Sequence, residues 1–225
     1  MVRNSFSPCI RLAFDGQGGF RRCVYLVFKD FSDRFLAFWA LLFLMPFLSL
    51  VAILIFFSLG SPVFFRQKRP GYRGRPFWLL KFRTMSNAKD AGGVFLSDRD
   101  RLSPFGNWLR ETSIDELPAL FNILCGEMSF IGPRPLLMQY LPLYTPFQAR
   151  RHDVKPGFSG WAQINGRNAI SWEEKFTLDV WYVDHQSLAL DLRIFLITIS
   201  KVITREGVNA IGEVAMPSFS GSPPD

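Results

Sequence analysis

Residues 35–59 read FLAFWALLFLMPFLSLVAILIFFSL, a stretch of 25 residues without a charged side chain. As an α-helix this stretch would be about 37 Å long at ~1.5 Å per residue, which is long enough to cross a lipid bilayer. It is too long for the apolar part of a signal peptide, and a basic cluster follows it instead of a small-residue cleavage site. We therefore expect a membrane-embedded helix.

Charged residues are distributed unevenly around this stretch. The chain has 225 residues and a net charge of +7. The net charge is +3 over residues 1–34 (six basic, three acidic), zero over 35–65, +7 over 66–83 and −3 over 84–225. Basic residues gathered beside an apolar segment indicate contact with anionic lipid head groups, whereas a nucleic-acid binder usually spreads them over its folded domain.

The two basic flanks bear on how the apolar segment sits in the membrane. Basic flanks favour the cytoplasmic side, and a single crossing would leave one flank on the other side. Pro46 lies near the middle of the segment, where it removes a backbone hydrogen bond and kinks a helix. A bent, re-entrant helix would keep both flanks cytoplasmic, but proline also occurs in ordinary crossing helices. The residues alone leave both topologies open.

The composition is that of a folded protein. Hydrophobic residues make up 48% of the chain and aromatic residues 16%, which excludes a disordered chain and is enough for one domain with a sizeable core. The cysteines Cys9, Cys23 and Cys125 are odd in number and widely spaced, so they predict neither a disulfide framework nor a structural zinc site. This cysteine usage fits a reducing compartment.

The rest of the chain predicts a mainly α fold with short strands (α+β). FWLLKF at 77–82 is typical of a short strand, and the polar segment 86–100 of a surface loop. Helical spacing of apolar residues predicts two short helices within 103–135 and two longer helices at 172–185 and 188–205.

Three finer features accompany these elements. Gly126 suits the C-terminal cap of a helix. The segment from Pro217 (PSFSGSPPD) should be flexible. The last helix has an apolar face that would pack on the core or lie in the membrane interface. This face consists of Leu192, Phe195, Leu196, Ile199 and Val202.

The acidic pair Asp115-Glu116 is the main candidate for chemistry. Ser113 and Glu116 match a capping box, so a purely structural role is a strong alternative. Pro118 lacks a backbone N–H and also fits a helix capped by Asp115. Either way we expect Asp115 at a helix N-terminus, which favours an ionised carboxylate and anion binding. Spacing alone favours capping over catalysis.

Three basic residues are candidates for binding phosphate. Arg110 lies five residues before Asp115, and Arg134 lies in the rigid turn Gly132-Pro-Arg-Pro135. Two arginines near an acidic pair suit a diphosphate with a divalent cation. Taken singly, each is more typical of a surface or packing residue, and Lys81 is equally typical of a lipid-facing anchor. Motifs of P-loop proteins, dinucleotide-binding folds and zinc proteases are absent from the sequence.

With these residues in view, the sequence resembles the bacterial sugar transferase family, the monotopic polyprenyl-phosphate phosphoglycosyl transferases. The resemblance runs from about Lys29 to Pro217. It rests on a basic segment before an apolar helix broken by Pro46, Lys81-Phe-Arg-Thr-Met85, Leu109-Arg110-x4-Asp115-Glu116-Leu-Pro118, Met128-Ser-Phe-Ile-Gly-Pro-Arg-Pro135, and Lys155-Pro-Gly-Phe-Ser-Gly-Trp-Ala-Gln-Ile-Asn-Gly-Arg167. Together these blocks are highly specific, and the family favours the re-entrant helix.

The resemblance implies a two-step transfer of a sugar 1-phosphate from a UDP-sugar to polyprenyl (undecaprenyl) phosphate. Asp115 matches the nucleophile that forms a covalent phosphosugar intermediate with release of UMP. Glu116 matches the second carboxylate of the dyad, and Arg110, Arg134 and Lys81 match phosphate-binding residues. The expected cofactor is Mg²⁺, with Asp115 as a ligand. This reaction would be the first membrane step in the assembly of an exopolysaccharide or another glycan.

The resemblance also implies a domain organisation. It divides the chain into a basic extension (1–28), a membrane re-entrant helix region (29–65), a cytoplasmic catalytic domain with interfacial amphipathic helices (66–216) and a flexible tail (217–225). The multi-span N-terminal region of larger relatives is absent, so we expect a minimal catalytic form. The expected location is the bacterial inner membrane, with the catalytic domain on its cytoplasmic face.

Two other functions remain open from the sequence. One is a non-catalytic, membrane-anchored interaction module in which the acidic pair caps a helix; the other is a single-step transferase without a covalent intermediate. The tail at 205–217 resembles that of relatives that use N-acetylated amino sugars, but the sugar is not determined. Expected partners are a UDP-sugar, polyprenyl phosphate and membrane lipids, with a homo-oligomer left open and no nucleic acid.

Overall fold

The structure, a computed structural model, describes residues 17–90, 92–166, 170–204 and 218–221. Over these residues the chain is mostly helical with two small sheets, which confirms the predicted α+β class. The elements are α2 (Gln17–Leu59), β1 (Phe64–Pro70), η1 (Tyr72–Gly74), β2 (Pro76–Phe82), α3 (Asp98–Arg101), α4 (Pro104–Glu111), η2 (Ile114–Glu116), α5 (Ala119–Leu124), β3 (Ser129–Ile131), η3 (Met138–Leu143), α6 (Pro146–Ala149), η4 (Arg150–His152), β4 (Gly157–Ser159), α7 (Trp161–Asn165), α8 (Trp172–His185) and α9 (Leu188–Thr204), where η marks a 3-10 helix.

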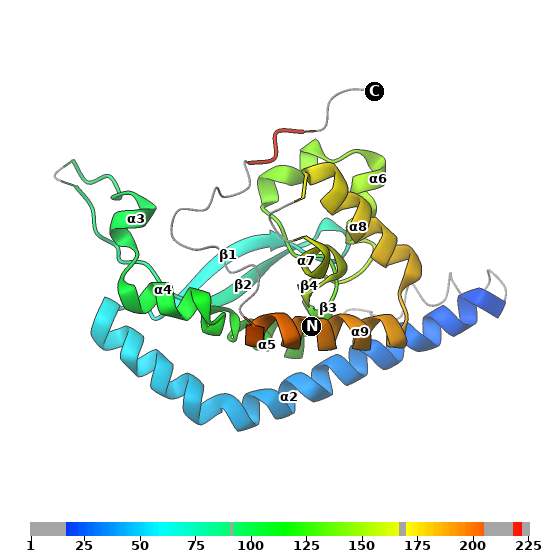
Figure 1. The fold of residues 1–225 in the computed structure, drawn as a ribbon, viewed down its shortest axis with the longest axis horizontal. Coiled ribbons are helices and arrows are strands. Elements are labelled where there is room, and N and C mark those ends of the chain that lie inside the picture. Colours follow the sequence, from blue (N-terminus) through cyan, green and yellow to red (C-terminus); the bar gives the residue numbers. More distant parts are fainter. Residues whose placement is uncertain (1–16, 91, 167–169, 205–217, 222–225) are drawn as a thin grey trace.

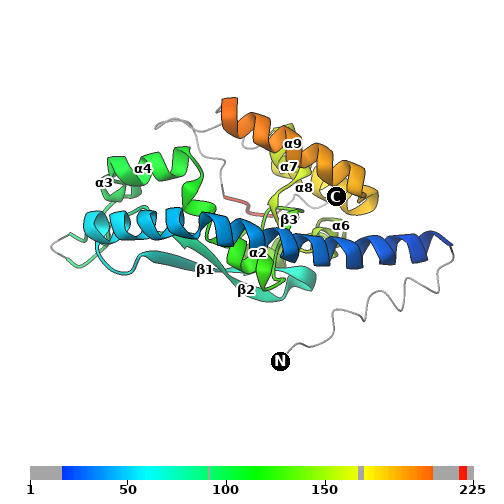
Figure 2. The same ribbon diagram turned by 90° about the horizontal axis from the view of Figure 1, so that it is seen from below.

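The longest element is α2, which begins well before the apolar stretch that predicts it. Figure 1 shows that α2 is bent in its middle part and that the outside of the bend faces away from the other labelled elements, and Figure 2 shows the same helix running along the whole length of the fold. Pro46 lies inside this helix. An interior proline removes one backbone hydrogen bond and clashes with the preceding turn, which is a recognised cause of a kink. The helix is therefore bent, as the proline predicts.

One face of α2 packs on the domain and the other is exposed. Phe43 and Phe57 on the outer face are 76% and 81% exposed, although both side chains are large and apolar. By length and composition, α2 qualifies as a membrane segment from Arg22 to Leu59. An exposed apolar surface of this extent indicates contact with lipid or with a partner. The inner face contributes five residues to the main core: Ala37, Leu41, Leu48, Val51 and Ile55.

A β-hairpin follows α2. Strands β1 and β2 are antiparallel, with Phe64 opposite Phe82 and Pro70 opposite Pro76. The predicted strand at 77–82 is confirmed as part of β2. Phe77, Leu79 and Phe82 of β2 are buried in the main core, which this strand shares with α2, α4 and α5.

The buried side chain of Asn122 joins α5 to the edge of β2 that does not pair with β1. Its Oδ1 atom accepts a hydrogen bond of 3.0 Å from the backbone N–H of Leu80, and its Nδ2 atom donates one of 2.8 Å to the carbonyl of Trp78. The amide thus pairs with the strand as a neighbouring strand would. This contact fixes the position of the strand that carries Lys81 against the helix that follows Asp115 and Glu116.

The predicted elements between 86 and 135 are present. Helices α4 and α5 confirm the two short helices, and α3 starts near the end of the predicted loop. Gly126 follows α5 with φ +77°, the left-handed conformation that terminates many helices. A Cβ atom at this position would also lie 2.1 Å from the guanidinium of Arg34, so a larger residue would require this side chain to move.

The second half of the chain forms a separate core around β3, β4, α8 and α9. The strands are parallel, and α8 has the predicted bounds. Ile194 of α9 is fully buried in this core. On the opposite side Leu192 and Leu196 are 56% and 57% exposed, so packing of the apolar face on the core is the wrong alternative. Successive residues of an α-helix point in directions about 100° apart, so Ile194 lies on a different face of α9 from Leu192 and Leu196.

The segment near the C-terminus differs from its prediction. Phe219 is only 4% exposed and its ring packs against those of Tyr140, Tyr144, Trp172 and Phe176. The expectation of a flexible tail therefore does not hold for 218–221; the rest of the tail lies outside the described residues. A single aromatic ring in an aromatic pocket is enough to hold a short polar segment.

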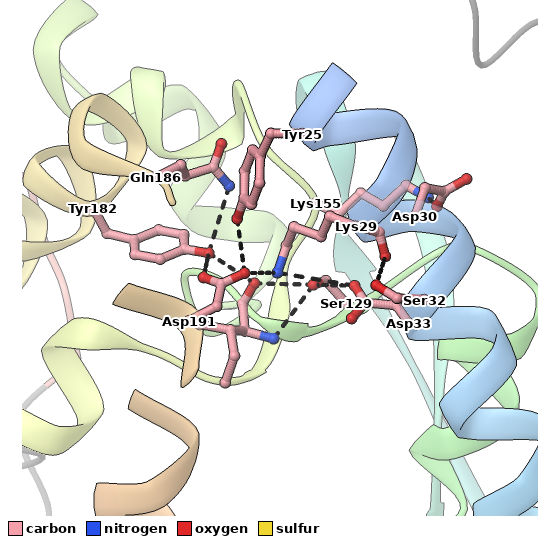
Figure 3. A network of polar contacts seen from close by, with 11 residues as sticks. Tyr25, Lys29, Asp30, Ser32, Asp33, Ser129, Lys155, Tyr182, Gln186 and Asp191 are labelled. Carbon is pink, nitrogen blue, oxygen red and sulfur yellow. Dashed lines mark hydrogen bonds and ion pairs between the residues drawn. The ribbon is translucent and has the colours of Figure 1, made fainter. Parts of the chain in front are cut away.

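A polar network joins the N-terminal part of α2, before Pro46, to α8 and α9 (Figure 3). Asp191 of α9 is its centre: Oδ1 accepts a hydrogen bond of 2.6 Å from Tyr182, and Oδ2 accepts one of 2.7 Å from Tyr25 and pairs with Lys29. Lys29 also lies 3.9 Å from Asp33, whose carboxylate accepts a bond from Ser129. All these charges are partnered, as buried charges must be.

Arg83 holds the other end of α2. Its guanidinium donates hydrogen bonds to the carbonyls of Leu59, Gly60 and Ser61, at 2.6 Å for Gly60 and 3.1 Å for Ser61. The last carbonyls of a helix have no partner within the helix and carry the negative end of its dipole. Arg83, itself 6% exposed, supplies both the donors and the opposite charge.

Candidate active site

Asp115 and Glu116 lie in the 3-10 helix η2, between α4 and α5. Ser113 precedes them with φ +57°, a left-handed conformation that is uncommon outside glycine and turns the chain sharply after α4. Neither the Ser113 side chain nor Asp115 caps a helix, and α5 has Pro118 at its N-cap position. The capping-box alternative is therefore wrong, and Asp115 caps no α-helix; the expected place at a helix N-terminus holds only in that Asp115 lies in the first turn of the 3-10 helix η2. Glu116 makes ion pairs instead, and charge-assisted bonds are stronger than a cap bond.

Glu116 binds two of the three predicted cations. Its Oε1 atom accepts a hydrogen bond of 2.6 Å from Lys81 and one of 2.5 Å from Arg134, whose second nitrogen lies 3.4 Å from Oε2. Burial by itself would raise the pKa of this carboxyl, but the charges and hydrogen bonds of Arg134 and Lys81 outweigh it and lower the pKa well below its usual range. Glu116 is therefore ionised throughout the physiological pH range.

Asp115 is in the opposite situation. It is 9% exposed, and among the described residues its carboxylate has no direct hydrogen bond or ion pair. Burial and the negative charge of Glu116 raise the pKa of Asp115 to about 6, which the cations Lys81, Arg110 and Arg134 offset only in part. A carboxylate with an unused lone pair and a raised pKa beside fixed cations is a typical reactive group.

Both carboxylates line a cleft of about 1570 Å³. Lys81, Arg110 and Arg134 line the same cleft, so the structure brings all five predicted site residues together. Arg110 does not touch the acidic pair. Its Nε atom donates a hydrogen bond of 2.9 Å to Thr84, which positions it at the end of α4. The cleft continues along α9, which contributes Thr198, Lys201 and Val202 to its wall.

The donor set of the cleft fits a magnesium ion. The described residues contain no group of three or more His, Cys, Asp and Glu side chains that would hold a metal by themselves. Mg²⁺ is commonly held by one or two carboxylates together with substrate phosphates and water. Asp115 offers one open carboxylate, whereas Oε1 of Glu116 is taken by Lys81 and Arg134.

A buried ion pair behind Arg134 was not predicted from the sequence. Arg151 and Asp179 have side chains that are 1% and 3% exposed, and Arg151 also bonds to the backbone carbonyl of Arg134. Asp179 lies in the apolar stretch FTLDVWYV, and Asp191 in LALDLRIF. A single acidic residue among apolar helix residues is the signal that would have indicated both buried pairs.

Comparisons with known proteins find a matching family and several relatives. The sequence model of the family described as bacterial sugar transferase matches residues 24–205. The chain is 59% identical over 165 residues to an uncharacterised sugar transferase, EpsL, of Bacillus subtilis, a match that covers 73% of this chain and 82% of that protein.

Two longer relatives have names that specify a reaction. One is the UDP-glucose:undecaprenyl-phosphate glucose-1-phosphate transferase of Xanthomonas campestris, 39% identical over 199 residues, which are 83% of this chain and 41% of that protein. The other is the UDP-N-acetylgalactosamine-undecaprenyl-phosphate N-acetylgalactosaminephosphotransferase of Aeromonas hydrophila, 36% identical over 192 residues, which are 82% and 45%. The chain thus spans less than half the length of these two proteins.

Proposed function

Because the chain belongs to the bacterial sugar transferase family, we propose that it transfers a sugar 1-phosphate from a UDP-sugar to polyprenyl phosphate and releases UMP. The observation that carries this proposal is the contrast within the acidic pair. Asp115 lines the cleft with no direct partner among the described residues, while Glu116 holds Lys81 and Arg134. One carboxylate is free to react, and the other keeps two cations beside it.

In the first step an oxygen of the Asp115 carboxylate attacks the β-phosphorus of the UDP-sugar. The bond between this phosphorus and the bridging oxygen breaks, and UMP leaves with the electron pair. The product is a mixed anhydride between Asp115 and the sugar phosphate. Lys81, Arg110 and Arg134 offset the negative charge of the phosphates that the carboxylate must approach.

In the second step a phosphate oxygen of the polyprenyl phosphate attacks the phosphorus of this intermediate. The bond to Asp115 breaks, the carboxylate is restored, and the sugar diphospho-lipid leaves. Glu116 remains ionised and keeps Lys81 and Arg134 oriented in both steps. A covalent intermediate divides one difficult transfer between two anions into two easier transfers.

Magnesium is part of the proposal. Asp115 would hold Mg²⁺ through the carboxylate oxygen that does not attack, with substrate phosphate oxygens as further ligands. When bound, the ion supplies positive charge at the transferred phosphate.

We further propose that α2 is a re-entrant helix that enters and leaves the inner membrane by the cytoplasmic face. The bend of α2, the basic flanks and the exposed face of α9 support this placement. The apolar side chains of α9 would then lie in the membrane interface beside the cleft that this helix lines. Such a placement brings a water-soluble UDP-sugar and a lipid phosphate to the same site.

The function is tested with detergent-solubilised protein, Mg²⁺ and a panel of UDP-sugars. With a suitable UDP-sugar alone, we expect a burst of about one UMP per protein and a phosphosugar on Asp115, detected by mass spectrometry. Polyprenyl phosphate should then allow continuous turnover. UMP formation only in the presence of the lipid would indicate a single-step transferase, and no UMP with any donor would support an interaction module. The panel also identifies the sugar, since 205–217 lies outside the described residues.

Topology is tested by labelling Cys9 in a variant that lacks Cys23 and Cys125. We expect no reaction with a membrane-impermeant reagent in intact cells, since both termini would be cytoplasmic. Pro46→Leu restores a backbone hydrogen bond and should convert part of the population to a crossing helix. Labelling of Cys9 in the parent variant would refute the re-entrant topology.

A further inference from the structure

Arg134 is supported from behind by a buried ion pair. Arg151 of η4 donates two hydrogen bonds to Oδ2 of Asp179 on α8, at 3.0 Å from Nε and 2.7 Å from Nη2. Both side chains are almost completely buried. The Nη2 atom also donates a bond of 2.8 Å to the backbone carbonyl of Arg134. One guanidinium therefore connects α8 to the loop that carries a cleft residue.

This loop has few means of its own to hold Arg134 in place. Pro133 and Pro135 flank Arg134, and neither has a backbone N–H that could donate a hydrogen bond. The carbonyl of Pro133 accepts a bond of 3.0 Å from the N–H of Gly157, which fixes one side of the loop to β4. The bond from Arg151 fixes the next carbonyl, at Arg134 itself.

Arg151 has little freedom to move. Its guanidinium lies 5.6 Å from the ring centre of Phe176 and 5.9 Å from that of Tyr144, and Nη1 is 3.3 Å from the Tyr144 hydroxyl. Cation–π contacts and a buried carboxylate hold a planar guanidinium in a single orientation. Any displacement of Arg151 would be passed to the backbone of Arg134.

We propose that Arg151, held by Asp179, is a positioning residue that sets the guanidinium of Arg134 for the diphosphate of the donor. The inference rests on the proposed function, because it takes the ligand of Arg134 to be the UDP-sugar. Arg134 bonds to Glu116 at 2.5 Å, so its position also affects the acidic pair. Displacement of a binding group by about 1 Å can weaken its action up to a hundredfold.

The chain offers a matched control. Arg150, the neighbour of Arg151, forms an ion pair with Asp184 on the same helix α8, but this pair is exposed (42% and 41%). Arg150 and Asp184 do not line the cleft, whereas Arg151 and Asp179 do, so the R134A background is needed to separate positioning from direct contact with the ligand. R150M and R151M therefore remove the same group from adjacent residues, and only R151M removes the contact with Arg134.

The experiment measures binding of UDP, which carries the diphosphate without the sugar, by calorimetry in the presence of Mg²⁺. We expect R151M to weaken UDP binding by about tenfold or more and R150M to leave it unchanged. The decisive comparison uses the R134A background, where R151M should cause no further loss. In turnover assays R151M should raise the KM for the UDP-sugar and leave the KM for polyprenyl phosphate unchanged, a split that general misfolding would not produce.

Thermal unfolding and circular dichroism check that the variants fold. If R151M does not fold, R151K, which keeps the charge and loses the planar fork, replaces it with a smaller expected loss. Equal loss from the Arg151 variant with and without Arg134, or UDP binding unchanged by that variant, would overturn the inference. UDP binding that is lost in R134A without any UMP formation by the wild type would refute the proposed reaction and leave the positioning role intact. No effect of R134A on UDP binding would overturn the positioning role itself.

Discussion

The cleft around Asp115 and the network around Asp191 both contain acidic and basic side chains, but their carboxylates are bonded differently. At Asp191 both carboxylate oxygens are engaged, by Tyr182 on one side and by Tyr25 and Lys29 on the other (Figure 3). In the cleft Lys81 and Arg134 bind Glu116, and Asp115 is left without a direct partner among the described residues.

On the proposed mechanism, the difference separates a structural carboxylate, Asp191, from a reactive one, Asp115. A buried carboxylate that is fully bonded stabilises the elements it joins. Asp191 joins the N-terminal part of α2 to α8 and α9. A buried carboxylate with unused lone pairs costs stability but keeps a nucleophile available. Substitutions in the cleft should therefore change turnover and leave folding intact, and those at Asp191 should do the reverse.

The largest effect on turnover is expected for Asp115→Asn. The amide has the same size but is a poor nucleophile, so transfer should fall by about a thousandfold or more while the melting temperature stays nearly the same. UMP formation and thermal unfolding are measured on the same preparation. Activity within about tenfold of wild type would rule out Asp115 as the nucleophile.

Glu116→Gln should have the second largest effect. The change keeps the side-chain size but leaves Lys81 and Arg134 without the charge that holds them, so we expect turnover to fall by about a hundredfold. Steady-state rates and circular dichroism separate lost catalysis from lost structure. Turnover close to that of the wild type would mean that the two cations need no carboxylate to stay in place.

Arg134→Ala should have a smaller effect that is specific to the donor. The loss of a charge-assisted contact to phosphate should raise the KM for the UDP-sugar about tenfold or more. Arg193→Ala is the control, since Arg193 lies outside the cleft and contacts the ring of Trp161. Equal kinetics for the two variants would indicate that the Pro-Arg-Pro turn is only structural.

Asp191→Asn should change turnover per folded molecule by less than about twofold, because the residue lies outside the cleft. Its removal leaves Lys29 without its closest partner, and breaking a buried pair should lower the melting temperature by roughly 5 °C or more. Thermal unfolding in detergent measures this shift. A large loss of turnover in the folded variant would contradict the division between the two regions.

The smallest effect at neutral pH concerns the charge of Asp115. With a pKa of about 6, this carboxyl is mostly ionised at pH 7 and loses its nucleophilic form as the pH falls through 6. Glu116→Gln removes a negative neighbour and should lower the pKa of Asp115. Because Asp115 is already mostly ionised at pH 7, the ionised fraction should rise only slightly at that pH. Carbon NMR of the labelled aspartates in the metal-free proteins measures both values. An unchanged pKa in the variant would mean that Glu116 does not raise the pKa of Asp115, and a raised pKa would mean that Lys81 and Arg134 move away from Asp115 when Glu116 loses its charge.

The sequence predicted the elements better than their contacts. Helical spacing located α8 to the residue, because local side-chain pattern and capping determine a helix of that length. Pattern also identified β2, the two short helices and the apolar segment. The start of α2 was missed because residues 17–34 are charged as well as apolar, and several of their charges pair with residues far along the chain, such as Lys29 with Asp191 and Asp30 with Lys155.

The sequence predicted which residues form the candidate site but not which of them bind one another. Motifs identified Asp115, Glu116, Lys81, Arg110 and Arg134. Spacing suggested a capping box, since local rules do not include the ion pairs that Glu116 makes with residues 35 positions before it and 18 after it. Phe219 escaped prediction for the same reason, because its aromatic pocket is assembled from distant parts of the chain.

The contact of Arg83 with the end of α2 has a consequence for how deep this helix can lie in a membrane. A helix that stops below the head groups would leave its last carbonyls without water, at a cost of several kcal/mol for each group. Here the donors come from the guanidinium of Arg83, the residue that follows β2. In the proposed membrane placement, the point at which the chain leaves the hydrocarbon is thus set by the folded domain as well as by the number of apolar residues. Lengthening the apolar run by one turn would detach the carbonyls from Arg83 before it changed the tilt of the helix.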